Sequence, residues 1–173
     1  MAVLLRNKTI CPMCGRLIEE GEDTSLFPHF ILNENDPLYE FSDSACHTAC
    51  LASHPLGQAL ALASEANAEH TGPGKRRCAV CGAEILDPDD YLLIGYLGDP
   101  TRNGIAEFNF THLHKSHLAQ WRDAYRFLGL AKEMLASGRW KGPALLMLVQ
   151  KIEAAIGHSE SEHEPIPGSV DNS

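Results

Sequence analysis

The chain has 173 residues and a mass of 18.9 kDa, enough for one compact domain or two small ones. Its 44% hydrophobic and 21% charged residues can supply a folded core, which excludes disorder throughout. The formal net charge of −9 argues against general binding to a phosphate backbone. No apolar run approaches the roughly 20 residues that span a bilayer, and the apolar start is too short for a secretory signal. We therefore expect a soluble cytoplasmic protein.

Two pairs of metal-ligand residues bound the first unit of the chain, which we place at about residues 8–55. The pairs have the patterns C-x-x-C and H-x-x-C: Cys11 and Cys14, then His47 and Cys50. Gly15 follows the first pair and permits a sharp turn, so this pair is expected to form a knuckle. Side chains three residues apart share one face of a helix, and Ser44 is placed as its N-cap. The second pair is therefore expected in the first turns of a helix.

Short apolar runs separated by turn residues fill the segment between these two pairs. The runs are Leu17-Ile18, Leu26-Phe27 and Tyr39-Glu40-Phe41. Gly21 and Asp36-Pro37 are turn signals between them. The pattern predicts a β-hairpin between the knuckle and the helix.

The segment after Cys50 is predicted to form a further helix and then a linker. Pro55 begins the helix, which runs to about Asn67, and residues 68–74 form the linker with its Gly-Pro-Gly sequence. Lys75-Arg76-Arg77 follows the linker. Three basic residues in that position are typical of a solvated stretch, with contact to phosphate or an acidic partner as the alternative.

The same ligand pattern returns 67 residues later, in a second unit at about residues 75–122. Its ligand pairs are Cys78 and Cys81, then His114 and His117. Thr111 takes the place of Ser44 as the expected N-cap. The offset also aligns residues that bind no metal: Gly15 with Gly82, Ile18 with Ile85, Asp23 with Asp90, Leu26 with Leu93, Leu38 with Ile105, Glu40-Phe41 with Glu107-Phe108, and Leu51 with Leu118. So many matches in one register predict an internal duplication of one structural unit.

The donor atoms of the two quartets suit Zn²⁺, which thiolate sulfur and imidazole nitrogen hold tetrahedrally. The first quartet has three cysteines and one histidine, and the second has two of each. Four protein ligands leave no open position for water, so two structural zinc ions per chain are expected. A unit of about 50 residues buries too little apolar surface to be stable alone. Zinc binding, worth about 10–16 kcal/mol in zinc-finger peptides, supplies the difference.

Cysteines and histidines outside this register receive other interpretations. Disulfides are not favoured, because the register of the cysteines and the lack of an export signal both oppose them. Cys46 lies next to His47, but its counterpart is Leu113, so we assign Cys46 to core packing, with ligand exchange as the alternative. Outside the tail at 158–173, four histidines have no ligand-type counterpart and are interpreted as surface or packed residues: His29, His54, His70 and His112. Of these, His54 and His112 flank the ligand helices, where outer donors or alternative ligands would lie.

The order of knuckle, hairpin and ligand-bearing helix resembles the treble-clef zinc finger, and the resemblance covers most of both units. It implies an α+β fold with two duplicated zinc-binding treble-clef units. LIM domains are a more distant likeness, because they also combine C-x-x-C with H-x-x-C. Here, however, 32 residues separate Cys14 from His47, and the second unit starts well beyond Cys50. The chain is therefore not identified as a LIM protein.

A C-terminal helical hairpin is predicted after the second unit. The helix of the second ligand pair is expected to run on through apolar residues to Leu135 and to end at Gly138. A second helix begins at Gly142-Pro143 and ends at Gly157. These helices are expected to have no equal in the first unit and to pack on each other and on the zinc units, with dimerisation as the alternative. Residues 158–173 are acidic and expected to be disordered.

The predicted organisation has four parts: a first zinc unit with its trailing helix at 1–70, a second zinc unit at 71–122, a helical extension at 123–157 and an acidic tail at 158–173. Charge is uneven among them. Residues 1–70 hold three basic and ten acidic side chains, whereas the remainder is nearly balanced. The first unit is therefore expected to present an acidic face to a basic partner.

The chain contains no catalytic triad, P-loop or dinucleotide fingerprint, so we expect a non-enzymatic zinc protein that binds another protein. An inhibitor or immunity-type protein that covers a basic surface is one version of this function. An HNH-like nuclease is an alternative, with His29 as the base and His47 on a catalytic metal. Nucleic-acid binding through the second unit is another, and the basic residues available there are Lys75, Arg76, Arg77, Arg102, Lys115 and Arg122.

Overall fold

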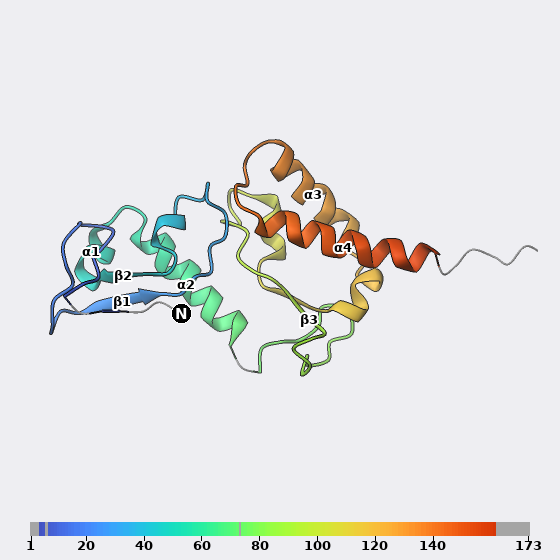
Figure 1. Cartoon of the computed structure of the whole chain (residues 1–173), viewed down its shortest axis with the longest axis horizontal. Helices are drawn as coiled ribbons and strands as arrows, with labels where there is room; N and C mark the ends of the chain where they lie inside the picture. The colour runs from blue at the N-terminus through green and yellow to red at the C-terminus, as the bar shows by residue number, and fades with distance from the viewer. Residues whose placement is uncertain (1–3, 6, 73, 162–173) are drawn as a thin grey trace, which may run out of the picture.

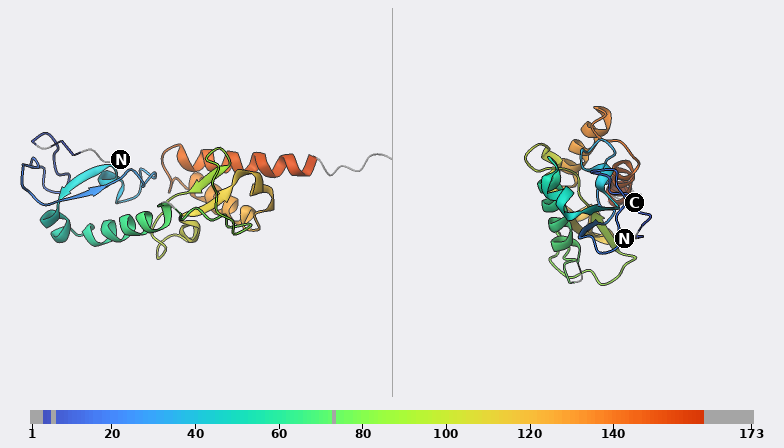
Figure 2. Two further views of the ribbon diagram at one scale, coloured as in Figure 1. Left: turned by 90° about the horizontal axis from the view of Figure 1, so that it is seen from below. Right: turned by 90° about the vertical axis from the view of Figure 1, so that its left-hand side faces the viewer.

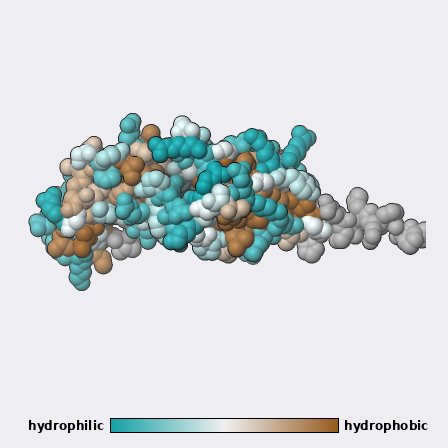
Figure 3. All heavy atoms as spheres, turned by 90° about the horizontal axis from the view of Figure 1, so that it is seen from above, coloured by the Kyte–Doolittle hydropathy of each residue, from teal (hydrophilic) through white to brown (hydrophobic). Residues whose placement is uncertain are grey.

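The computed structural model of the chain describes residues 4–5, 7–72 and 74–161, with side chains as far as residue 157. The described residues form two small antiparallel hairpins and a set of helices, so the fold is mixed α and β. Figure 1 shows an elongated molecule with the first hairpin at one end and the second hairpin with the C-terminal helices at the other. A space-filling view shows apolar patches on one long face, broken up by hydrophilic residues (Figure 3).

The first unit is built around one hairpin. Its elements in chain order are β1 (Thr24–Phe27), the 3-10 helix η1 (Tyr39–Phe41), β2 (Ser44–His47), α1 (Thr48–Ser53) and α2 (Gly57–Thr71). The register pairs Thr24 with His47, so His47 lies at the open end of the hairpin. β2 leads directly into α1, which brings the first turn of that helix next to the end of the strand.

The second unit repeats this layout at the same distance along the chain. Its elements are β3 (Tyr91–Ile94), the 3-10 helix η2 (Gly104–Phe108), β4 (Thr111–His114) and the 3-10 helix η3 (Lys115–Gln120). Both strands begin 67 residues after their counterparts, and Tyr91 pairs with His114 as Thr24 pairs with His47. The residue directly before the second strand of each hairpin has a left-handed backbone conformation in both units, with φ of 60° at Asp43 and 59° at Phe110.

Two helices complete the fold: α3 (Ala124–Ala136) and α4 (Ala144–Ser161). Gly138, with φ of 69°, follows the end of α3, as predicted. The expectation that both helices lack an equal in the first unit is wrong for α3, which begins 67 residues after α2. None of the helices in the described part of the chain combines the length and apolar character needed to cross a bilayer.

The predicted N-caps are the main local error. Ser44 and Thr111 do not cap helices but begin the strands β2 and β4. Their hydroxyl groups donate hydrogen bonds to the carbonyl oxygens of Phe41 and Phe108, at 2.6 and 2.9 Å. A hydroxyl that bonds to a carbonyl three residues earlier closes a turn, and this pattern competes with helix capping for the same residue types. The helices therefore start one turn later than predicted.

Three other boundaries also differ from the prediction. The helix of the second ligand pair does not run on, because extended backbone at Trp121 separates η3 from α3. Gly157 does not end the last helix, which continues to Ser161, so residues 158–161 are helical and not disordered. Helix α2 likewise extends to Thr71 and shortens the linker. The rest of the predicted tail, 162–173, lies outside the described residues.

Each unit has its own hydrophobic core, and the two cores share residues. The core of the second unit combines its hairpin with one face each of α3 and α4, around Leu113, Phe127 and Leu145. The core of the first unit includes Tyr96 and Phe110, which come from the second unit. Tyr96 packs edge-on against Phe30 with ring centroids 5.9 Å apart. The two units are therefore packed against each other and are not independent domains.

Asn33 joins the first unit to the loop between α3 and α4. It is 7% exposed, and its side-chain amide donates to the carbonyl oxygen of Arg139 at 3.1 Å. Its side-chain oxygen accepts hydrogen bonds from the backbone N–H groups of Asn35 at 3.1 Å and Lys141 at 3.0 Å. A salt bridge of 2.9 Å between Lys141 and Glu34 lies beside them. This contact fixes the helical extension against the first unit.

We expect Asn33→Ala to lower the free energy of unfolding by about 2–3 kcal/mol, because it removes three hydrogen bonds made by a buried side chain. Asn35→Ala is the matched control, since the exposed Asn35 amide makes a single bond of this kind, to the carbonyl oxygen of Gly138 at 2.8 Å. It should cost about 0.5–1 kcal/mol. Urea denaturation measures both values, and equal effects would contradict the assigned role of Asn33.

Candidate metal centres

Two tight turns present the C-x-x-C pairs in the same way. In the first, the N–H of Gly15 donates to the carbonyl oxygen of Cys11 at 2.8 Å, and in the second Gly82 donates to Cys78 at the same distance. Both glycines have φ of 72°, a left-handed conformation that a side chain would strain. Each turn aims its two sulfur atoms at the end of the adjacent hairpin.

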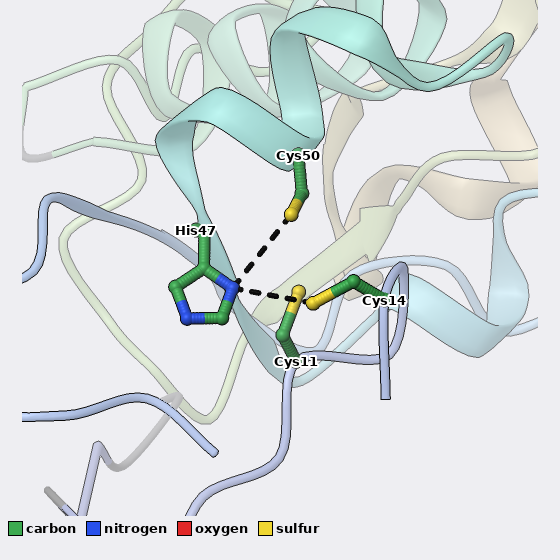
Figure 4. A group of neighbouring side chains, drawn as sticks. All are labelled: Cys11, Cys14, His47 and Cys50. Atoms are coloured by element: carbon green, nitrogen blue, oxygen red, sulfur yellow. Dashed lines mark hydrogen bonds between the residues drawn. The ribbon is translucent and has the colours of Figure 1, made fainter. Parts of the chain in front are cut away.

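The first cluster gathers three cysteines and one histidine from three segments of the chain. Figure 4 shows the sulfur atoms of Cys11, Cys14 and Cys50 directed toward the ring of His47. His47 Nδ1 lies 3.4 Å from Cys14 Sγ and 3.7 Å from Cys50 Sγ. All four ligand atoms lie within 4.8 Å of one another. These separations match the about 3.6 Å between sulfur and nitrogen that tetrahedral zinc with ordinary bond lengths requires.

The second cluster has the same geometry with one more imidazole. Cys81 Sγ lies 3.6 Å from His114 Nδ1, and Cys78 Sγ lies 3.8 Å from His117 Nδ1. The four ligand atoms again lie within 4.8 Å of one another. Each cluster could therefore hold a metal ion, and sulfur and imidazole donors in a closed set of four fit zinc better than calcium or magnesium, which take oxygen ligands.

The strand-to-helix junction sets the position of the second ligand pair. His47 and His114 are the last residues of β2 and β4, and Cys50 and His117 follow one helical turn later. A backbone bond closes each junction. In the first unit, the N–H of Thr48 donates to the carbonyl oxygen of Asp23 at 3.0 Å. The corresponding bond in the second unit has a length of 2.7 Å.

Backbone N–H groups favour thiolates in both clusters. The N–H of Arg16 lowers the pKa of Cys14 to about 6. Burial disfavours the thiolate of Cys78, but backbone donors led by His114 outweigh it and lower the pKa of Cys78 to about 6. A hydrogen bond with Cys14 raises the pKa of Cys50 to about 11. Several thiolates at this spacing repel one another, and a divalent cation removes that repulsion.

Glu22 contacts the first cluster, and the sequence analysis did not single it out. Its Oε2 atom lies 3.0 Å from His47 Nε2, which donates the hydrogen bond and leaves Nδ1 facing the sulfur atoms. The backbone N–H of Glu19, and then His47, lower the pKa of Glu22, so the partner is a carboxylate. An outer carboxylate of this kind fixes the ring of a metal-binding histidine. One signal in the sequence could have pointed to Glu22: the residue 67 positions later, Asp89, is also acidic.

Cys46 lies outside both clusters. It is fully buried, as is its counterpart Leu113, and burial raises its pKa to about 11. A thiol that stays protonated behaves as a small apolar side chain, in agreement with the core assignment.

The four other histidines whose side chains are described also lie outside the two groups of ligand atoms. His112 is buried; its Nε2–H donates to the carbonyl oxygen of His70, and its Nδ1 accepts from the hydroxyl of Tyr91, both at 2.9 Å. His70 stacks on Phe110, and the Nδ1 atom of His54 accepts a backbone hydrogen bond. The exposed His29 follows the end of β1 that lies away from His47.

Loss of a single ligand should remove one metal ion from one cluster. We expect Cys14→Ser and Cys81→Ser each to lower bound zinc from two equivalents to one and to unfold the affected unit. Cys46→Ala is the control and should keep both ions, since Cys46 lies outside the four-ligand set. Elemental analysis of protein purified under reducing conditions measures the content, and loss of an ion from Cys46→Ala would contradict the ligand assignment.

Glu22→Ala should weaken metal binding at the first cluster alone. The loss of an outer carboxylate typically lowers affinity by about 10–100-fold, because the imidazole is no longer held in position. Competition with a chromophoric chelator resolves the two clusters. Glu20→Ala is the control, because it removes an exposed acidic residue close to Glu22 in the sequence. It should leave the metal affinity of both clusters unchanged. An equal loss of affinity in Glu22→Ala and Glu20→Ala would show that the effect comes from charge alone.

Comparison with known proteins does not assign the chain to a family. No family model matches the chain, and neither a curated protein nor a solved structure matches it. The chemistry of the molecule is therefore defined by its own residues: two closed Cys and His quartets, each able to hold a metal ion, on two hairpins of the same layout.

Proposed function

We propose that this chain is a non-enzymatic protein with two structural zinc ions that binds another protein. The observation that carries the proposal is the closed donor set of each cluster. Four protein ligands converge within 4.8 Å, and a tetrahedral zinc ion held in this way has no position for water or substrate. The ions would stabilise a surface and would not catalyse a reaction.

The proposal includes the treble-clef architecture and the internal duplication. Support comes from the shared order of knuckle, hairpin and ligand-bearing helical turn, at one offset in both units. The isolated bridges between Ile10 and Leu17 and between Arg77 and Glu84 extend this agreement to the knuckles. A single unit duplicated and then diversified accounts for these positions with the fewest assumptions.

Zinc would supply stability that the hairpins lack. Two strands of four residues make a marginal sheet in water. Each ion would join the knuckle to the strand-to-helix junction and thereby close a loop of more than 30 residues. Thiolate ligands also require reduced cysteines, so the proposal places the protein in a reducing compartment such as the cytoplasm.

The proposed partner is a protein with a basic surface. Ten acidic and three basic side chains lie within residues 1–70, so this part of the chain attracts cations. An inhibitor or immunity-type protein that covers a basic surface is the specific version that this charge favours. Complementary charge would accelerate the encounter and make it sensitive to salt.

Neither alternative function gains a specific supporting observation. For an HNH-like nuclease, His29 would have to act beside His47, yet it follows the opposite end of strand β1. For nucleic-acid binding, several of the basic residues are engaged within the chain. Arg102 pairs with Asp99, and the Lys115 ammonium donates to a carbonyl oxygen at 2.6 Å. We therefore retain protein binding as the proposed function.

Metal analysis and partner capture test this proposal. The purified, reduced chain should contain two zinc ions, and removing them with EDTA should abolish its far-UV circular dichroism transition on heating, because the units no longer fold cooperatively. A tagged chain should retain a basic protein partner after nuclease treatment and lose it after EDTA. A chain that folds fully without metal, or a partner that nuclease releases, would contradict the proposal.

A further inference from the structure

A groove of about 760 Å³ runs between the two units, outside both metal centres. One wall is helix α2, which Figure 2 shows passing along one side of the molecule from the first hairpin toward the second unit. The loop around Asp36 and the loop around Asp99 also line the groove. Two further lining residues are Tyr96 and Phe110, which join the two cores. The groove thus exists only because the two units are packed together.

Helix α2 presents an apolar stripe to this groove. Ala59, Leu62 and Ala66 line it at steps of three and four residues, and Leu62 is 59% exposed. The structural counterpart α3 serves as an internal comparison. The equivalent residues there are Arg126, Gly129 and Glu133, and both charged side chains form salt bridges at the surface. The apolar stripe is therefore a property of α2 and not of the shared layout.

Charged side chains of both signs also line the groove: Asp36, Asp99, Arg102 and Arg139. Arg139 forms a salt bridge with Glu133. Among the described residues, Asp36 forms no ion pair, whereas Asp99 pairs with the exposed Arg102 at 3.5 Å. Burial raises the pKa of Asp36, and the charge of Asp99 adds to the increase, whereas the backbone N–H of Leu38 and the charge of Arg102 oppose it. Burial, together with these two carboxylates, also raises the pKa of Tyr96. Asp36, Asp99 and Tyr96 therefore lie close enough to influence one another. A positively charged ligand beside Asp36 would favour its ionised form.

We propose that this groove binds a peptide segment of a partner protein, in which leucine-like side chains lie against Ala59, Leu62 and Ala66 and a lysine or arginine reaches Asp36. The inference rests on the proposed function and names the surface that performs it. From Leu56 to His70 the α2 wall extends about 21 Å, which suits several side chains of a peptide better than one small molecule. A second copy of the chain would bring its own net charge of −9 and be repelled.

Fluorescence polarisation with the zinc-loaded full chain tests this inference. The probes are short fluorescein-labelled peptides that combine two leucines with one lysine, compared with peptides that carry glutamine or glutamate in its place. We expect binding in the order lysine, glutamine, glutamate. Leu62→Asp should weaken binding of the lysine peptide at least about tenfold, and Asp36→Asn should remove the preference for lysine over glutamine.

Leu146→Asp is the matched control, because Leu146 is also a helical leucine with 47% exposure but lies on α4, outside the groove. It should bind the lysine peptide like the wild type. Equal binding by Leu62→Asp, no binding of the lysine peptide by the wild type, or equal binding of the glutamate peptide would each overturn the groove assignment. Light scattering that detects a dimer sensitive to Leu62→Asp would assign the groove to a second copy instead.

These outcomes are separable from failure of the proposed function. Zinc content and nuclease-resistant capture of a partner are measured on the same wild-type and Leu62→Asp proteins. A partner retained equally by both variants would leave the protein-binding function in place and move its surface elsewhere. Loss of zinc from the wild type, by contrast, would contradict the proposed function before any peptide is added.

Discussion

The attachment of a knuckle to the end of a hairpin is the contact on which the rest of this structure depends. In each unit the C-x-x-C turn meets a histidine at the end of a strand and a second ligand one helical turn later. Neither hairpin has enough apolar surface to fix that arrangement by itself, because each strand has only four residues. A four-coordinate ion would replace the missing core with directional bonds, so the order of the ligands along the chain also sets the order of the elements in space.

Packing between the units adds a second constraint that ligand patterns do not express. Tyr96 and Phe110 belong to the second unit by sequence but complete the core of the first. Asn33 forms its buried hydrogen bonds with the loop between α3 and α4. Helix α2 then ends on the second hairpin, where its His70 carbonyl oxygen accepts a hydrogen bond from His112. Three separate contacts thus hold the two ligand clusters in a fixed relation.

Much of this arrangement can be predicted from the sequence because metal ligands leave a local and periodic signal. The offset of 67 residues identifies both quartets and excludes Cys46, whose counterpart Leu113 is apolar. The first residues of the helices are harder to predict, since the hydroxyl groups of Ser44 and Thr111 can close a turn as well as cap a helix. The partnership of Glu22 with His47 depends on strand register, and register is decided by contacts between residues far apart in the chain. The groove is still harder to predict from the sequence, because its lining residues come from both units.

The placement of Tyr96 and Phe110 also decides how the chain can be divided. A cut between the two units would remove both aromatic rings from the core of the first unit. Phe30 would lose its aromatic partner, and apolar side chains of that core would meet water. The first unit alone is therefore expected to be less stable than the same residues within the full chain.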